Sequence, residues 1–382
     1  MLIAGEPSGD RLAAELVRAL RQEIASLVPR SPDLQLIERE LSPRCFGAGG
    51  PAMAEAGVEI VEDMMGHAVT GLTGVIKRLP TFRKVFNDLQ KLALERRPDL
   101  VICVDFSEFN TRFADRLFST IRREAGTFTN WQPRIVRFAS PQVWAARAGR
   151  AWKLARSVDL LLSIIPFEKD WYEQRTPQLK VEFVGNPIID RYLDFQRPVR
   201  PSDNERPVVA LLPGSRRSEL NRHLPPIIDA AERIHSQEQV QFKMILPDER
   251  ILEIANEHPL PSFVDVRVGG IPELLSVASI AIASTGTVTL ECAYFGVPTI
   301  ALYKTTFINY QIGKRLVTIR HMAMPNLIAN DDIFPEFIQD AATGANLARA
   351  ALHWLRHPRE MAIVRQKLAD VVTTLGEPGA VR

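Results

Sequence analysis

Two strand-to-helix turns in the second half of the chain have residues suited to binding phosphate. The first turn follows Val208–Leu212, an apolar run with the pattern of a buried strand, and contains Gly214, Ser215 and Arg216. A small-residue turn before a helix presents backbone N–H groups to an anion, and the helix dipole favours negative charge there. Arg216 adds a guanidinium group, whose planar donors match phosphate geometry. This turn therefore predicts an anion site.

The second turn repeats this design further along the chain. An apolar stretch at residues 280–283 predicts the strand that leads into it. The turn itself consists of Ser284, Thr285, Gly286 and Thr287. Either turn alone is also typical of an ordinary connection in an α/β domain. Together they favour a diphosphate, and hence a nucleotide, and Glu291 lies one helical turn further on, within reach of a ribose hydroxyl.

An aspartate in the first half of the chain has the position of a general base. Residues 100–105 predict a buried strand with Asp105 at its carboxyl end, the end that faces the ligand crevice in open α/β sheets. Asp105 is therefore the best general-base candidate of this half, although a turn or helix-capping role also fits its position. A Gly- and Ser-containing turn at residues 5–10 suits close approach of a ligand. The strand before it is short, which leaves open whether the chain starts upstream.

An uncharged stretch followed by cations indicates either a lipid-contacting surface or a core helix. Residues 64–76 carry no formal charge, and four basic residues follow between Lys77 and Lys84. The stretch is too short to span a bilayer. An apolar face rimmed by cations fits anionic lipid, and a core helix with a solvated charged end fits equally well. A second basic series, from Arg147 to Arg156, fits either a solvated helix face or a contact with lipid phosphate.

Length and composition place the chain among globular proteins with two domains. It has 382 residues, of which 46% are apolar and 24% are charged. A net charge of +2 disfavours a nucleic-acid role. The three widely spaced cysteines predict neither a disulfide framework nor a metal site and favour a reduced, cytoplasmic compartment. The sequence contains no run of about 18 apolar residues, so it predicts no membrane-spanning helix.

The organisation of the chain predicts an α/β fold. The Pro-rich, charged stretch at residues 197–207 predicts a linker. Strand and helix patterns alternate on both sides of it, which predicts two doubly wound, Rossmann-like domains with parallel sheets that face each other across a cleft. The expected limits are 1–196 for the first domain and 207–358 for the second, nucleotide-binding domain. A terminal helix at 359–382 is expected to return to the first domain.

Eight motifs, in order along nearly the whole chain, resemble the lipid-A-disaccharide synthases, a family of inverting glycosyltransferases with the GT-B architecture. The motifs are AGEPSGD (4–10), GAGGPAM (47–53), FN (109–110), SPQVWAAR (140–147), IPFEKDWY (165–172), LLPGSRRSE (211–219), STGTVTLE (284–291) and MPNLIAN (324–330). One of them alone is a weak signal, but eight in the same order are highly specific.

The resemblance implies a hexosyltransferase of lipid A, and hence lipopolysaccharide, biosynthesis. The donor would be UDP-2,3-diacylglucosamine and the acceptor 2,3-diacylglucosamine 1-phosphate, also called lipid X. The products would be a β-1,6-linked disaccharide 1-phosphate and UDP. The resemblance implies no metal and no cofactor. It also implies peripheral association with the cytoplasmic face of the inner membrane, and it allows a homodimer.

The resemblance also assigns roles to residues of this sequence. Asp105 matches the family's essential aspartate and Glu6 the acidic residue of its first turn, so both are catalytic candidates. Arg216, Glu291 and Asn326 match family residues of the UDP site, together with the small residues of the two phosphate turns. With this resemblance, a lipid-contact role is favoured over a core helix for residues 64–76. The candidates for contact with acceptor or lipid are Met64, Met65, Val69, Leu72, Val75, Ile76 and Arg147.

Three departures from the family pattern point to a divergent member, and one of them is the short first strand. Phe106-Ser107-Glu108 follows Asp105 where the family usually has Ala-Pro-Asp, which places a bulky ring beside the base and leaves Glu108 as the fallback base. Asn186 stands where the family usually has a histidine, so a proton role at that position is absent. The alternatives are a UDP-N-acetylglucosamine 2-epimerase-like enzyme and a catalytically degenerate relative that binds nucleotide or lipid.

Overall fold

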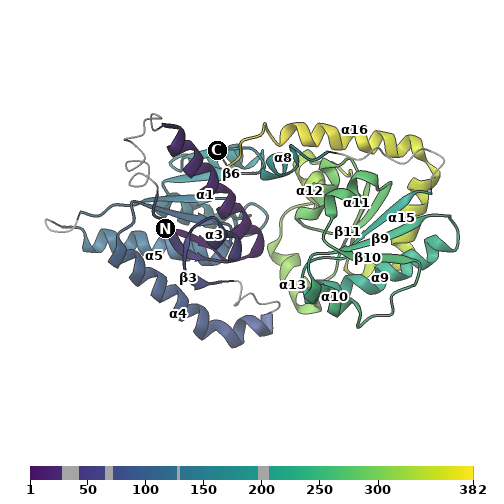
Figure 1. Ribbon diagram of the computed structural model, residues 1–382, viewed down its shortest axis with the longest axis horizontal. Coiled ribbons are helices and arrows are strands. Elements are labelled where there is room, and N and C mark those ends of the chain that lie inside the picture. Colours follow the sequence, from purple (N-terminus) through teal and green to yellow (C-terminus); the bar gives the residue numbers. More distant parts are fainter. Residues whose placement is uncertain (28–42, 65–71, 127–129, 197–205, 382) are drawn as a thin grey trace. The chain divides into compact units, whose positions relative to one another are not determined.

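The computed structural model describes residues 1–27, 43–64, 72–126, 130–196 and 206–381, with the backbone alone for residues 72–79. These residues form two compact units, Met1–Pro187 with Glu377–Arg382, and Ile188–Gly376. Each unit is an α/β structure built on one parallel sheet, as the alternation of strand and helix patterns predicted (Figure 1). In the part of the chain that is described, no helix has the length and apolar character needed to cross a membrane.

The first unit contains a seven-stranded sheet in the order β3-β2-β1-β4-β5-β6-β7. Its strands are β1 (Leu2–Ala4), β2 (Phe46–Gly49), β3 (Glu59–Asp63), β4 (Leu100–Val104), β5 (Arg134–Phe138), β6 (Leu160–Ser163) and β7 (Val181–Phe183). Its helices are α1 (Pro7–Leu27), α3 (Pro51–Glu55), α4 (Leu72–Arg96), α5 (Ser107–Glu124), η2 (Ala148–Arg150), α6 (Ala151–Ser157) and α7 (Glu168–Glu173).

Alternate residues of the central strands supply two separate cores, one on each face of this sheet. Ile3, Val101 and Cys103 pack into one core with residues of α4, α5, α6 and α7. Leu2 and Ile102 pack into the other with residues of α1 and α3. Because both faces are covered, the strands read as continuous apolar runs rather than as alternating ones.

The second unit contains a six-stranded parallel sheet in the order β10-β9-β8-β11-β12-β13. Its strands are β8 (Val208–Leu212), β9 (Gln241–Leu246), β10 (Val264–Val268), β11 (Ile280–Ser284), β12 (Thr299–Tyr303) and β13 (Glu336–Ile338). Its longer helices are α9 (Arg217–His235), α13 (Phe307–Leu316), α15 (Gly344–Arg356) and α16 (Pro358–Thr374). Shorter helices are α8 (Pro187–Tyr192), α10 (Glu249–Ala255), α11 (Ile271–Val277), α12 (Thr287–Tyr294), α14 (Met324–Ala329) and η3 (Gln339–Ala341).

Helix packing in this unit forms two groups. Helices α9 and α15 lie against each other (Figure 1). Helices α12, α14 and α16 pack together as a second group. The C-terminal helix α16 therefore belongs to the second unit, and the short segment after it, Glu377–Arg382, is assigned to the first.

Each sheet has one topological switch point, and these two points position the candidate site residues. In the first unit the chain runs from β1 outward to β2 and β3, then returns to place β4 on the other side of β1. In the second unit it runs from β8 to β9 and β10, then places β11 on the other side of β8. In open parallel sheets the strand ends beside such a reversal open into the ligand-binding crevice.

Candidate active site

The loops after β1 and β4 bring the catalytic candidates of the first unit to its switch point. Asp105 directly follows β4, and its backbone N–H donates to the carbonyl oxygen of Phe138 at 3.0 Å. Asp105 and Phe106 both have left-handed backbones, with φ angles of 44° and 49°. Non-glycine residues rarely adopt this conformation because it is strained. Residues that do adopt it are concentrated at functional sites. The half-buried carboxylate of Asp105 is thus presented by an unusual turn.

Asn110 fixes the geometry of this turn. Its buried side-chain amide donates to the carbonyl oxygens of Ile3 and Val104 at 3.1 Å and of Asp105 at 2.9 Å. These three acceptors lie at the adjacent ends of β1 and β4, so one side chain ties the two strand ends together. The asparagine of the FN motif is therefore a positioning residue for Asp105, a role that the motif alone did not specify.

Phe106 packs across the turn that follows β1. A Cβ atom added to Gly5 would lie 2.3 Å from the Phe106 ring, so only glycine leaves room for it. The ring stacks on Phe109 with centroids 5.1 Å apart, and Phe82 of α4 lies 6.4 Å from it. Phe86 continues this aromatic cluster. The ring that distinguishes this chain from the usual family pattern is therefore part of an apolar wall beside Asp105.

The first turn contains two acidic residues with different surroundings. Glu6 is half-buried in the loop directly after β1, beside the switch point. Asp10 is 4% exposed and accepts from the backbone N–H groups of Gly50, Ala52 and Met53 at 2.7, 3.0 and 3.3 Å. Asp10 thus caps helix α3 and joins the AGEPSGD and GAGGPAM motifs. Sequence reasoning missed this role, because the cap connects residues about forty positions apart.

Glu108, the fallback base, is held by two arginines. Arg112 donates to it at 2.7 Å and Arg150 binds its other oxygen. Burial raises the pKa of Glu108, but these guanidinium groups outweigh that effect and leave the pKa below its usual value. A carboxylate stabilised in this way is a weak proton acceptor. Arg156 of the same basic series pairs with Asp115 of α5, although its side chain stays 56% exposed.

A buried polar network lies under the SPQVWAAR and IPFEKDWY motifs. Glu168 is fully buried and accepts from the Trp144 indole at 2.7 Å and the Ser163 hydroxyl at 2.6 Å. Burial raises its pKa to about 7, since these hydrogen bonds only partly compensate for lost hydration. Ser140 and Tyr172 share a hydrogen bond of 2.9 Å in the same network. Sequence reasoning recognised the motifs but not the buried carboxylate.

Arg137 is a second buried charge in this region. It is 1% exposed, and its Nε donates to the carbonyl oxygen of Ala139 at 3.3 Å. Within the described residues its two terminal nitrogens have no hydrogen-bond partner. Burial lowers its pKa, while the charges of Cys103, Asp105 and Tyr172 act in the opposite direction. Asn186, the other departure from the family pattern, is also buried and donates to the carbonyl oxygen of Ile164 at 2.9 Å.

In the second unit, the first phosphate turn is occupied by a carboxylate of the protein itself. Gly214 has a φ angle of 121°, a conformation that favours glycine. The backbone N–H of Ser215 donates to Glu219 at 3.3 Å, and Arg216 donates to the other oxygen of Glu219 at 3.0 Å. Glu219 lies in the first turn of α9. The donors predicted to bind a phosphate therefore already hold an anionic group.

His223 connects this turn to a more distant strand end. Its Nδ1 lies 2.9 Å from the carbonyl oxygen of Pro213, and its Nε2 accepts from the backbone N–H of Lys304 at 3.0 Å. Because a carbonyl oxygen can only accept, Nδ1 carries the proton in the neutral ring. Burial lowers the pKa of His223 and favours this neutral form. The loops after β8 and β12 are thereby held together, a contact across 81 residues that no local pattern indicated.

The second phosphate turn lies beside the first at the switch point. Strands β8 and β11 pair in parallel with Leu212 opposite Ala283, so both turns leave the sheet at the same edge. A Cβ added to Gly214 would lie 3.4 Å from the Ser284 hydroxyl, which shows how close the turns are. Gly286 has a φ angle of 136° and precedes α12, which begins at Thr287. Thr285 donates its backbone N–H to Leu302 at 3.1 Å and is therefore anchored.

Glu291 is half-buried and Asn326 is fully buried, and both side chains are held by other groups of the protein. The Tyr192 hydroxyl donates to Glu291 at 2.7 Å, and Arg191 lies 3.8 Å from the same oxygen. Asn326 is fully buried, donates to Phe334 and Glu336 at 2.8 Å, and accepts from the Phe334 backbone at 2.8 Å. The described contacts of Asn326 thus brace α14 from inside. A direct contact of either side chain with a nucleotide stays a prediction.

The lipid-contact candidates fall into four groups. Met64 is 1% exposed and packs in the core of the first unit, where it offers no surface to a lipid. Leu72, Val75 and Ile76 lie in the first turns of α4, for which the backbone is described. Met65 and Val69 lie outside the described residues. Arg147 is exposed and has a left-handed backbone with a φ angle of 66°.

Two parallel-sheet α/β units define the class of the protein as that of the GT-B glycosyltransferases and their structural relatives. Solved structures similar to this chain include the calicheamicin glycosyltransferase CalG4, with a TM-score of 0.58, 15% identity, and coverage of 98% of this chain and 93% of that one. A UDP-N-acetylglucosamine 2-epimerase from Neisseria meningitidis has a TM-score of 0.58, 12% identity, and coverage of 97% and 95%. At such identities the likeness concerns the fold.

Sequence relatives identify the family within this class. The family model for lipid-A-disaccharide synthetase matches residues 1–381. The lipid-A-disaccharide synthase of Geobacter sulfurreducens is 34% identical over 99% of this chain and 93% of that protein. That of Myxococcus xanthus is 32% identical over 100% and 94%. The chain belongs to the lipid-A-disaccharide synthase family and is a glycosyltransferase, which confirms the interpretation of the eight motifs.

Proposed function

We propose that this enzyme transfers a 2,3-diacylglucosaminyl group from UDP to the 6-hydroxyl of 2,3-diacylglucosamine 1-phosphate. The C1–O bond to UDP breaks, a β-1,6 bond to the acceptor oxygen forms with inversion, and UDP leaves. The proposal rests on one observation above all. The catalytic carboxylate candidates flank the switch point of one sheet, and two phosphate-type turns flank the switch point of the other.

We assign the acceptor and its activation to the first unit. Asp105 takes the proton of the attacking hydroxyl as general base. Its half-buried position, its strained turn and the three hydrogen bonds of Asn110 suit a carboxylate that must hold a fixed direction. Glu108 is a weaker choice because Arg112 and Arg150 stabilise its charged form. Glu6, at the neighbouring strand end, is the second acidic group that we place at the acceptor.

We assign the donor diphosphate to the second unit. The leaving UDP develops negative charge, which Arg216 and the backbone N–H groups of the two turns can stabilise. The diphosphate must displace Glu219 from Ser215 and Arg216, since both already contact that carboxylate. We assign Glu291, near the start of α12, to the ribose. Asn326 supports this site by bracing α14 against the segment at Phe334.

The acyl chains of both substrates require an apolar path, and two regions support one. The aromatic cluster of Phe82, Phe86, Phe106 and Phe109 lies beside the Asp105 turn and continues into α4. Leu72, Val75 and Ile76 stand at the start of that helix. We propose that this end of α4 and Arg147 contact the lipid part of the acceptor. Met64 is excluded from such a contact by its burial.

Helix α13 supports association with a lipid surface. It has no buried residue, and Phe307, Ile308 and Ile312 are 73%, 67% and 46% exposed. Lys314 and Arg315 lie in its last turn, and no acidic residue occurs between residues 304 and 330. Apolar side chains next to cations fit the interface of an anionic bilayer. We propose peripheral association with the cytoplasmic face of the inner membrane. A homodimer stays a prediction from the family.

The experiment that tests this function combines purified enzyme with both acylated sugars and measures UDP release and disaccharide formation. Asp105→Asn is expected to lower turnover by about 10²–10⁴-fold while UDP affinity stays within about twofold of the unmodified enzyme. Glu108→Gln is the matched carboxylate control and should keep most activity. Full turnover in Asp105→Asn would remove this residue as the base.

A second arm tests the donor site with paired arginines. Arg216→Ala is expected to weaken UDP binding, since it removes a charge-assisted contact worth about 1.5–3 kcal/mol. Arg217→Ala is the matched control, because Arg217 pairs with Glu257 at 3.1 Å instead of lining the turn. Equal loss in both variants would contradict the assignment. UDP-N-acetylmannosamine formed from UDP-N-acetylglucosamine alone would favour an epimerase, and UDP binding without any product would favour a degenerate relative.

A further inference from the structure

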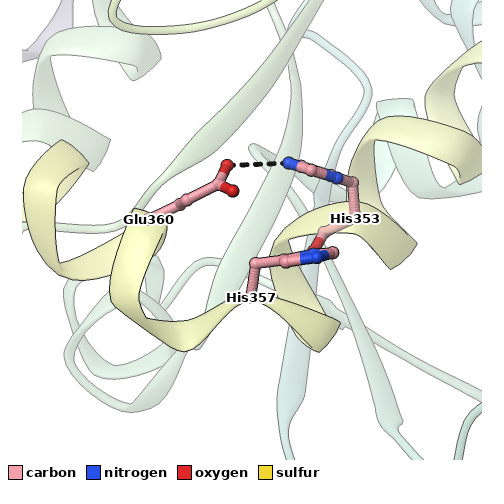
Figure 2. A group of neighbouring side chains, drawn as sticks. All are labelled: His353, His357 and Glu360. Carbon is pink, nitrogen blue, oxygen red and sulfur yellow. Dashed lines mark hydrogen bonds and ion pairs between the residues drawn. The ribbon is translucent and has the colours of Figure 1, made fainter.

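The junction between α15 and α16 brings together three side chains that ligate metals. His353 lies in the last turn of α15, His357 separates the two helices, and Glu360 lies in the first turn of α16. One ligand atom from each residue lies within 4.8 Å of the others, and all three residues are exposed (Figure 2). None of them belongs to the two phosphate turns or to the Asp105 turn. The function proposed above leaves them unexplained.

The tautomer of His357 is set by the protein. Its Nδ1 lies 2.6 Å from the backbone carbonyl oxygen of His353. A carbonyl oxygen accepts only, so Nδ1 carries the proton in the neutral ring, and the lone pair is on Nε2. A ligating histidine in metal sites usually donates its other ring N–H to a carbonyl or carboxylate in this way. His357 therefore already has the second hydrogen bond of a metal ligand.

His353 and Glu360 form the edge of a coordination site. His353 Nε2 lies 2.7 Å from Glu360 Oε2, so the two atoms share one proton. A tetrahedral ion with ligand distances of about 2.0–2.1 Å separates two ligand atoms by roughly 3.3–3.4 Å. Replacing the shared proton by a metal ion thus needs an opening of about 0.6–0.7 Å between exposed side chains. The two imidazole rings are stacked with centroids 4.3 Å apart and an interplanar angle of 27°, so His357 is near the site, and its exposed ring must turn about its side-chain bonds to direct Nε2 at the ion (Figure 2).

The arginine nearest to this junction is turned away from it. Arg356, which lies between the histidines in sequence, is turned to Glu238 at 2.7 Å and Gln237 at 3.3 Å. The last turn of α15 carries the negative end of its helix dipole and the first turn of α16 carries the positive end of its own, so the two dipoles oppose each other here. Trp354 and Leu352 are buried and anchor α15 from its other face. The ligand residues are therefore attached to a fixed helix end.

We propose that His353, His357 and Glu360 bind a divalent transition-metal ion, such as Zn²⁺, that clips α15 to α16. Two imidazoles and one carboxylate suit Zn²⁺, Co²⁺, Ni²⁺ and Cu²⁺, whereas Mg²⁺ and Ca²⁺ prefer oxygen ligands alone. The ion has a structural role and takes no part in glycosyl transfer. Helix α16 packs on α12 and α14, so the clip supports the group of helices behind the second phosphate turn.

The test uses tag-free, chelator-treated full-length protein titrated with Zn²⁺ by calorimetry and with Co²⁺ by visible absorption. One ion is expected to bind per chain, with Co²⁺ bands of a low-symmetry site, and Mg²⁺ is expected not to bind. His353→Ala, His357→Ala and Glu360→Gln should each weaken Zn²⁺ binding at least tenfold. His258→Ala, a histidine bonded to Asn221 on another helix pair, is the matched control and should not change it.

Thermal melts give an independent result. At free Zn²⁺ about a hundredfold above Kd, the ratio of folded to unfolded protein rises about a hundredfold, and the variants lose that increase. Because the three side chains are exposed, metal-free variants should melt close to the metal-free parent. Binding that survives in His353→Ala/His357→Ala, or no Zn²⁺ binding below about 1 mM, would overturn the site.

Discussion

The contact between Gly5 and Phe106 makes a prediction that can be worked out from the structure. Gly5→Ala places a Cβ atom 2.3 Å from the Phe106 ring. Carbon atoms pack at about 3.5–4.0 Å, so the ring must retreat by at least about 1.2 Å. It stacks on Phe109 at 5.1 Å, and its backbone already has a φ angle of 49°, so the retreat cannot be confined to the side chain. We expect Asp105, the neighbouring residue, to be displaced.

The expected cost of Gly5→Ala is about 1–3 kcal/mol of unfolding free energy, the usual range for overpacking a filled site. In a unit of this size each kcal/mol lowers Tm by about 2–4 °C. Displacing a catalytic group by about 1 Å can lower turnover about a hundredfold. Calorimetric melting and the UDP-release assay measure the two effects separately.

A double-mutant cycle decides whether the clash is the cause. Phe106→Ala removes the ring, so adding Gly5→Ala to it should cost little further stability. The coupling free energy between the two substitutions should therefore be about 1–3 kcal/mol. Additive losses would refute the reasoning, because Gly5 would then matter for a reason other than the ring. Gly149→Ala is a control, since a Cβ there meets no atom within 4 Å.

Three further predictions concern buried charge and exposed apolar surface. Burial raises the pKa of Glu168 from 4.5 to about 7. Between these pH values the folded protein holds a proton that the unfolded chain has released. The free energy of unfolding should therefore fall by about 1.4 kcal/mol per pH unit between pH 4.5 and 7. Denaturant unfolding should show this slope, and Glu168→Gln should flatten it. Arg137→Met should raise the unfolding free energy by about 1–4 kcal/mol, since it replaces a buried charge without terminal partners by an apolar chain; destabilisation would contradict this. Ile308→Glu on α13 should weaken sedimentation with anionic vesicles at least fivefold, whereas Ile363→Glu, 61% exposed on α16, should not.

The fold could be predicted from the sequence because buried parallel strands appear as continuous apolar runs. Val208–Leu212 and residues 100–104 form strands where the apolar runs predicted them. Strand β13 has no such signal, since its three half-buried residues show no alternation and its position depends on pairing with β12. Helix α9 runs through Pro225 and Pro226, although proline normally interrupts a helix; burial of Leu224 and Ile227 stabilises the helix across them.

The site was predictable where a residue's role depends on its place at a strand end. Asp105 and both phosphate turns could be located in this way, because the sheet order puts those ends together. The residues that hold the loops could not. Asp10, Asn110 and His223 act on partners about 40, 107 and 81 positions away, which no local pattern encodes. The i, i+4 spacing of His353 and His357 is visible in the sequence, but the spacing alone does not show that Glu360 lies beside them.

The carboxylate of Glu219 in the first phosphate turn affects which anions can enter. An anion that reaches only Ser215 and Arg216 exchanges one negative partner for another and gains little. Under the assignment proposed above, a ligand with two phosphates would also engage the turn after β11, so we expect it to recover more than it displaces. We therefore expect the turn to discriminate by ligand length, with a nucleotide diphosphate displacing Glu219 where chloride or a lone phosphate does not.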